Sequence, residues 1–182
     1  FNILLPSYQF ERANAWYSSY GKPNEQVQIL IYLGRSYAND GDYDKAMSIY
    51  TNALEIGEKN KLYNLVGYTY SYIGDLYREK AMRTEAIKKY EMAADNFKKE
   101  NNTDSYACAL RDMGREYACT DSISRALEIL LMADSITETS EDKDVKASIE
   151  NTLGNIYVMH NKYDKAKKFF YKALEGREKM PN

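Results

Sequence analysis

The chain has 182 residues, of which 44% are hydrophobic and 29% are charged, with a formal net charge of -2. This composition is typical of a folded protein with an ordinary charged surface, and it excludes a chain too polar to form a core. Lys and Arg are scattered rather than gathered into a basic face, so direct binding of nucleic acid is disfavoured. No apolar run approaches the roughly 18 residues of a membrane-spanning helix, so no membrane span is predicted.

The first segment, residues 1–21, contains part of a pattern that is complete further along the chain. Phe10 and Ala13 stand 40 positions before Tyr50 and Ala53, which belong to that pattern. The run Gly21-Lys22-Pro23 then interrupts any helix. We therefore predict a partial repeat, or N-terminal cap, over residues 1–21.

Residues 22–60 contain two helical stripes separated by a short turn. Apolar residues of the stretch 30–37 stand at spacings i, i+3, i+4 and i+7, which place them on one face of a helix. The stretch 46–53 repeats this spacing. Between them, Gly41 is suited to end the first helix and Asp42 to cap the second. The segment is predicted to form a helical hairpin.

The pattern of this hairpin returns three times, each time 40 residues later. We predict one array over residues 1–182, with full units at 22–60, 61–100, 101–140 and 141–182. Small residues in the pattern are expected where helices approach closely, and large ones where they fill the space between helices. The repeated columns are Gly34, Gly74, Gly114 and Gly154; Tyr37, Tyr77, Tyr117 and Tyr157; Ala46, Ala86, Ala126 and Ala166; Tyr50, Tyr90, Leu130 and Phe170; and Ala53, Ala93, Ala133 and Ala173.

The turn within each hairpin varies more than the helices around it. Asn161 is suited to the left-handed conformation that Gly41 is expected to adopt, whereas Ala81 and Asp121 are poorer choices in the same column. We expect the turns at Ala81 and Asp121 to be tighter, shifted or strained, with the pairing of helices preserved.

This Gly-aromatic-Ala-aromatic-Ala pattern resembles the tetratricopeptide repeat, whose pattern includes L-G-x2-Y, then A-x3-F, then A. The resemblance covers residues 24 to about 177, although these units have 40 residues where the family usually has 34. It implies an all-α, right-handed superhelical solenoid of antiparallel helix hairpins, with four full repeats and a partial N-terminal one. Similar 40-residue arrays occur in bacterial regulatory proteins, which implies the sensing or interaction part of a larger regulator.

The resemblance also implies a concave groove, formed by successive first helices, that binds a protein or peptide. Arg111 and Arg115 stand four apart on one helix face and could grip an acidic segment or a terminal carboxylate. Alternatively they form rim salt bridges, Arg111 with Asp75 for example. The candidate groove residues are Arg35, Asn39, Tyr68, Asp75, Arg78, Arg111, Arg115, Asn151 and Asn155.

Residues suited to catalysis or to metal binding are few. His160 is the only histidine and falls in a turn column, and neither Cys108 nor Cys119 has a second Cys or His at the close spacing of a zinc site. We therefore expect no enzyme activity, no cofactor and no metal. The composition leaves the compartment open, and the bacterial cytoplasm and periplasm both fit.

The last predicted helix, residues 163–177, has an apolar face that no further unit follows. Phe170 and Leu174 belong to this face, and solenoids normally carry a polar cap there. We therefore expect one of two arrangements: either the natural chain continues past Asn182, or this face meets a partner or a second copy of the chain. An alternative function is therefore structural, as a module that self-associates through residues 163–177.

Overall fold

The chain folds into helices joined by short turns. The computed structural model describes the backbone of residues 6–120 and 122–178, and these ranges contain helices and turns but no strand. In chain order the helices are α1 (Pro6–Tyr20), α2 (Pro23–Asn39), α3 (Tyr43–Lys59), α4 (Tyr63–Glu79), α5 (Arg83–Lys99), α6 (Thr103–Ala118), α7 (Ile123–Ile136), the 3-10 helix η1 (Thr137–Thr139), α8 (Lys143–Met159) and α9 (Tyr163–Glu178).

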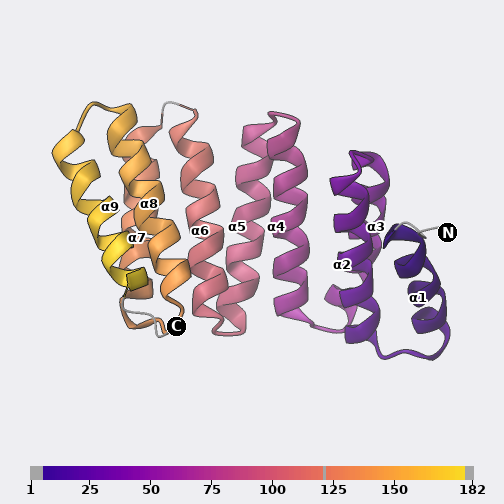
Figure 1. The fold of residues 1–182 in the computed structure, drawn as a ribbon. Coiled ribbons are helices and arrows are strands. Elements are labelled where there is room, and N and C mark those ends of the chain that lie inside the picture. Colours follow the sequence, from indigo (N-terminus) through magenta and orange to yellow (C-terminus); the bar gives the residue numbers. More distant parts are fainter. Residues whose placement is uncertain (1–5, 121, 179–182) are drawn as a thin grey trace.

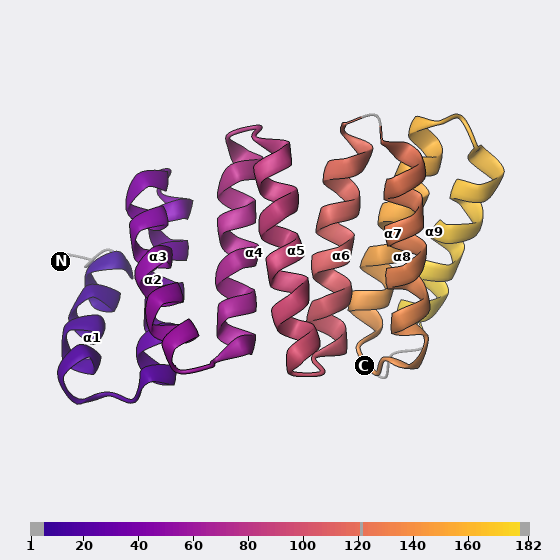
Figure 2. The ribbon, with the colours of Figure 1, turned by 180° about the vertical axis from the view of Figure 1, so that it is seen from behind.

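The helices stand side by side in one extended row (Figures 1 and 2). Antiparallel neighbours pair as α2 with α3, α4 with α5, α6 with α7 and α8 with α9, while α1 packs against α2 at the N-terminal end. The predicted all-α solenoid of antiparallel helix hairpins is confirmed. The side chain of Phe10, on which the partial N-terminal repeat was based, lies outside the described residues.

Six of the turns close with the same backbone hydrogen bond. After each of α2 to α6 and after α8, a backbone N–H donates to the carbonyl five residues earlier, at 2.9 to 3.1 Å. This bond is typical of the Schellman motif, which needs one residue with a positive φ. Gly41 supplies it with φ 80°, as expected, and Lys61, Asn101 and Asn161 adopt φ between 54° and 56°.

Ala81 also adopts a positive φ, of 56°, with the same closing bond, from Met82 N to Tyr77 O at 2.9 Å. Its turn is thus strained rather than tighter or shifted, because a residue with a Cβ pays roughly 1–2 kcal/mol for the left-handed conformation. Asp121, the other residue expected to disturb its turn, lies outside the described residues.

The connection between α7 and α8 is built differently. α7 has 14 residues, whereas α3 and α5 have 17, and its last turn is replaced by η1. Ser140 then runs in extended conformation, and the Asp142 side chain caps α8 by accepting hydrogen bonds from the N–H groups of Asp144 and Val145 at 3.0 and 3.2 Å. The α7–α8 junction therefore departs from the regular repeat.

The repeated glycines lie where the two helices of each hairpin cross. A Cβ added at Gly34 would stand 2.3 Å from the Tyr50 ring, and one at Gly74 would stand 2.6 Å from the Tyr90 ring. Gly114 faces Leu130 in the same way, so this aliphatic side chain occupies the place of the aromatic ones. Each crossing therefore depends on the absence of a side chain on its first helix.

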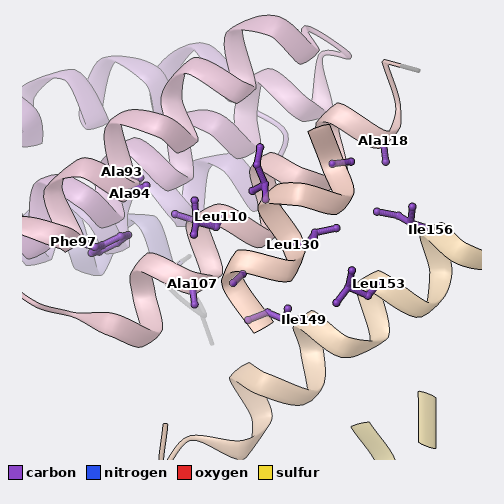
Figure 3. Close-up of a cluster of buried hydrophobic side chains, with 14 of the residues drawn as sticks. Ala93, Ala94, Phe97, Ala107, Leu110, Ala118, Leu130, Ile149, Leu153 and Ile156 are labelled. Carbon is purple, nitrogen blue, oxygen red and sulfur yellow. The ribbon is translucent and has the colours of Figure 1, made fainter. Parts of the chain in front are cut away.

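The core runs from hairpin to hairpin. Figure 3 shows its largest cluster, which runs from Phe97 of α5 through Leu110 and Leu130 of the third hairpin to Ile149 and Leu153 of α8. These side chains are almost completely removed from solvent. Burial of one such side chain is worth about 1.5–3 kcal/mol, so the cluster joins the second, third and fourth hairpins by the hydrophobic effect.

We expect Gly74→Ala to lower the free energy of unfolding by about 1–3 kcal/mol, because the new methyl group would overlap the buried Tyr90 ring. The control is Gly176→Ala, where a Cβ meets nothing within 4 Å, so the better helix propensity of Ala should leave stability equal or raise it by up to about 1 kcal/mol. Urea denaturation followed by circular dichroism measures both. Equal stabilities for the two variants would contradict the proposed role of the crossing.

Candidate binding groove

Two hollows lie between the first helices of the first two hairpins, α2 and α4. The larger has a volume of about 410 Å³ and the smaller about 210 Å³. Arg35 and Tyr72 line both, so the two hollows meet at this pair. Side chains lining only the larger one include Asn39, Asp75, Arg78 and Glu79, and those lining only the smaller one include Gln28, Ile31, Tyr32, Leu65 and Tyr68.

Arg35 is exposed at the centre of this region. Its guanidinium carbon lies 5.1 Å from the centroid of the Tyr72 ring, which in turn stacks on Tyr50 with a centroid distance of 5.9 Å. Within the part of the chain that the structure describes, Arg35 forms no ion pair within 4.0 Å. The face of the Tyr72 ring holds the Arg35 guanidinium in place, and the N–H groups of the guanidinium remain available to a ligand.

Arg78 lies in the same region but is already paired. Its guanidinium lies 2.9 Å from Asp75 and 3.3 Å from Glu79. The hydroxyl of the buried Tyr90 donates to Asp75 at 2.9 Å. Burial raises the pKa of Asp75, while Arg78 and the Tyr90 hydrogen bond act in the opposite direction. This group therefore stabilises the second hairpin and forms a polar wall of the larger hollow.

Arg111 and Arg115 lie on α6 and share one carboxylate. Arg111 lies 2.9 Å from Asp112 and donates to the Ser148 hydroxyl of α8 at 2.9 Å, while Arg115 lies 3.7 Å from Asp112 and is half-exposed. The pairing of Arg111 with Asp75 that the sequence left open is wrong, since Asp75 is bonded within its own hairpin. Arg111 is thus committed to the fold, and Arg115 is the freer of the two.

The remaining candidates differ in their surroundings. The Tyr68 hydroxyl is 2.8 Å from the Ser105 hydroxyl, and its ring meets the edge of Phe97 at a centroid distance of 4.9 Å. Asn151 and Asn155 lie on α8, the first half-buried and the second exposed. The structure thus gathers the candidates of α2 and α4 around the hollows and places those of α6 and α8 further along the array.

The sequence analysis named Tyr68 but missed the other aromatic side chains that line the hollows from the first helices, Tyr32 and Tyr72. Tyr32 and Tyr72 occupy the same column of the repeat in the first two units, followed by Asp112 and Thr152 in the later two. This switch from aromatic to polar could have indicated which half of the groove is built for apolar contact. Tyr43, which lines the larger hollow from the start of α3, could not be found from the first-helix columns.

The described residues contain no group of three or more His, Cys, Asp or Glu side chains able to hold a metal ion. None of the described helices is long and apolar enough to cross a membrane.

Family models of the tetratricopeptide repeat match residues 25–99 and 147–180. The chain belongs to the tetratricopeptide repeat family. Proteins of this family are typically interaction scaffolds that bind proteins or peptides.

Two known structures and one curated relative illustrate the likeness of this tetratricopeptide repeat chain. BtubC from P. vanneervenii superposes with a TM-score of 0.74 at 20% identity, over 96% of this chain and 77% of that one. MamA superposes with a TM-score of 0.64 at 23% identity, over 93% and 90%. Photosystem I assembly protein Ycf3 of Acaryochloris marina is 34% identical over 79 residues, 42% of this chain, and the match spans less than half (47%) of that protein. The two structures show a shared fold.

We expect Arg111→Ala to lower the free energy of unfolding by about 1–3 kcal/mol, because it leaves partly buried Asp112 with weaker pairing and removes the bond to Ser148. Arg35→Ala loses only an exposed cation–π contact, so its cost should not exceed about 1 kcal/mol. Chemical denaturation of the two variants measures the difference. A larger loss for Arg35→Ala would show that this arginine serves the fold rather than a ligand.

Proposed function

We propose that this chain is a non-enzymatic scaffold that binds a protein or peptide segment along its groove, with the hollows between α2 and α4 as the main anchor. The observation that carries the proposal is Arg35, a cation without a carboxylate partner in the described chain, standing where an apolar hollow and a polar hollow meet. The family and fold agree with this role.

The lining of the hollows suggests how a bound segment would lie. The smaller hollow offers apolar and aromatic walls, from Ile31, Leu65 and Tyr68, to an apolar side chain. A carboxylate next to that side chain would reach Arg35, which can form two parallel hydrogen bonds with it. The polar wall of Asp75 and Arg78 offers both donors and acceptors beyond that point. An extended segment combining an apolar and an acidic residue fits this order.

The 40-residue unit supports a further step of the proposal, that the array is the sensing or interaction part of a larger bacterial regulator. Arrays with this unit length occur in such proteins, as the resemblance noted above implies. A partner that occupies the groove would then report its presence to an output part of the regulator.

The groove is tested with peptides selected on the immobilised chain from a random display library and then measured by fluorescence anisotropy. Arg35→Glu and Tyr68→Ala should each weaken binding of the selected peptides at least about tenfold, because they remove the two anchors. Reversal of Arg115, the freer arginine of α6, to Glu should weaken binding of peptides that extend to α6. Circular dichroism confirms that each variant is folded.

Lys88→Glu is the matched control, since Lys88 is exposed on α5 and lines neither hollow. It changes the net charge as Arg35→Glu does and should leave affinity unchanged. Peptide binding that survives Arg35→Glu undiminished, or that falls equally with Lys88→Glu, would refute the assignment of the anchor.

A second candidate function, self-association, is supported by the apolar face of α9. Tyr163, Tyr171 and Leu174 are 61%, 59% and 53% exposed, and they line a hollow of about 380 Å³ together with Val158 and Phe170. In the first hairpin, Leu54 occupies the column of Leu174 and packs against the core of the next hairpin. We propose that a second copy of the chain covers the equivalent face of α9.

Light scattering after size exclusion should show a dimer that Tyr171→Glu with Leu174→Glu converts to a monomer, since burying two carboxylates in an apolar contact is costly. Phe170 is unsuitable for this test because its ring packs on Gly154 within the hairpin. Leu131→Glu, at a position of α7 that is 44% exposed, serves as the control. A parent chain that stays monomeric at high concentration would exclude this function.

A further inference from the structure

The irregular α7–α8 junction carries acidic side chains where the other units have apolar ones. Glu150 stands in the column of Leu30 and Leu110, and Asp134 stands in the column of Ala94. Glu150 is 2% exposed and Asp134 is 8% exposed. A buried carboxyl group weakens a junction unless it is paired, so packing does not explain this pair of residues.

A hollow of about 300 Å³ opens beside Glu150, between the first half of α8 and the last turns of α9. Lys143, Lys146 and Glu150 line it from α8, and Lys172 and Glu175 line it from α9. Gly176 also faces it, at a position where a Cβ would meet nothing within 4 Å. The shortened α7 and η1 leave Glu138 at the same rim.

Some of these charges are already satisfied and others are not. Lys146 lies 2.8 Å from Glu138, and Lys143 donates to the Ser140 carbonyl at 2.8 Å. Glu150, in contrast, forms no ion pair within 4.0 Å among the described residues. One buried acceptor that lines the hollow is therefore left for a donor from outside.

The opposite side of the hollow carries a loosely held cation. The one ion pair of Lys172 among the described residues is a long one, with Asp134 at 4.0 Å, and its ammonium group lies 5.5 Å from the centroid of the Phe169 ring. The Oδ1 atom of Asp134 is buried without a hydrogen-bond partner in the described chain. Burial, reinforced by Asp134, raises the pKa of Glu150, while Lys146 and Lys172 act against it. A positive group placed on Glu150 would therefore also favour its charged form.

The lysine and glutamate side chains that line the hollow indicate which kind of ligand it can bind. A simple anion would meet the carboxylates of Glu150 and Glu175, and a simple cation would meet Lys143 and Lys172. A small molecule that carries both charges can pair with both sides. We propose that this hollow binds a free α-amino acid, with its ammonium group on Glu150 and its carboxylate on Lys172.

This site is separate from the groove. None of the candidate groove residues lines the hollow, so a ligand here adds a second binding event to that of the peptide. Failure of the peptide experiments would leave this proposal intact, and the reverse also holds.

The experiment is calorimetric titration of the chain with each of the common amino acids. The strongest ligand is then compared with its N-acetyl derivative, which lacks the ammonium charge, and with its amide, which lacks the carboxylate. Each blocked form should bind at least about tenfold more weakly, because each loses one charge-assisted contact. No binding of any amino acid up to about 10 mM, or equal binding of the blocked forms, would overturn the proposal.

The array itself supplies suitable variants. Glu150→Leu introduces the residue type that the preceding unit has at the same position, Leu110. Lys172→Met does the same at its position, where the preceding unit has Met132. Both variants should reduce amino-acid binding at least about tenfold, and Glu150→Leu, which removes a buried carboxyl group, should keep or raise the melting temperature. Lys168→Met makes the same charge change at an exposed position of α9 outside the hollow and should bind as the parent does. Full binding by Glu150→Leu, or an equal loss with Lys168→Met, would also overturn the proposal.

Discussion

The close approach of two helices at a glycine is the contact on which the rest of the array depends. At the second hairpin the Tyr90 ring occupies the space that a side chain on Gly74 would take, and it is fully buried there. The same tyrosine donates to Asp75 in the groove. One residue thus sets the distance between the helices and fixes a polar group on the binding surface, so packing and groove chemistry cannot change independently.

The sequence predicted the hairpins, their turns and their packing because these depend on residues that recur every 40 positions. Leu130 is the one residue in its column that is not aromatic, and the hairpin forms nevertheless. The helix crossing requires a large side chain opposite the glycine, here Gly114, and Leu130 is large enough. The freedom of a groove residue depends instead on its particular neighbours. Arg35 and Arg111 are both predicted from the sequence to face the groove, but Arg35 lies on a Tyr72 ring while Arg111 is bonded to Asp112 and Ser148. A repeated pattern carries no information of this kind.

The most informative positions are those that break the pattern and yet remain buried. Glu150 was visible in the sequence as an acidic residue among Leu and Tyr, but its burial could not be predicted, because it also depends on the early end of α7 and on η1. The strain at Ala81 has a different meaning. It lies in an exposed turn, and its cost of roughly 1–2 kcal/mol concerns the conformation of one residue. A buried, unpaired carboxyl group beside an open hollow costs more and is accessible to a ligand.

Because each hairpin contacts mainly its neighbours, the stability of such an array is close to a sum of local terms. A weak junction between α7 and α8 therefore leaves the hollows between α2 and α4 intact, and the two sites can be occupied separately. A polar contact does join their surroundings: Arg111 of α6 donates to Ser148 of α8, two residues before Glu150. A ligand that shifts α8 would first reach the groove at Arg111, on the α6 side, rather than at Arg35. Coupling between the two sites would therefore alter the part of the groove at α6 before it alters the hollows around Arg35.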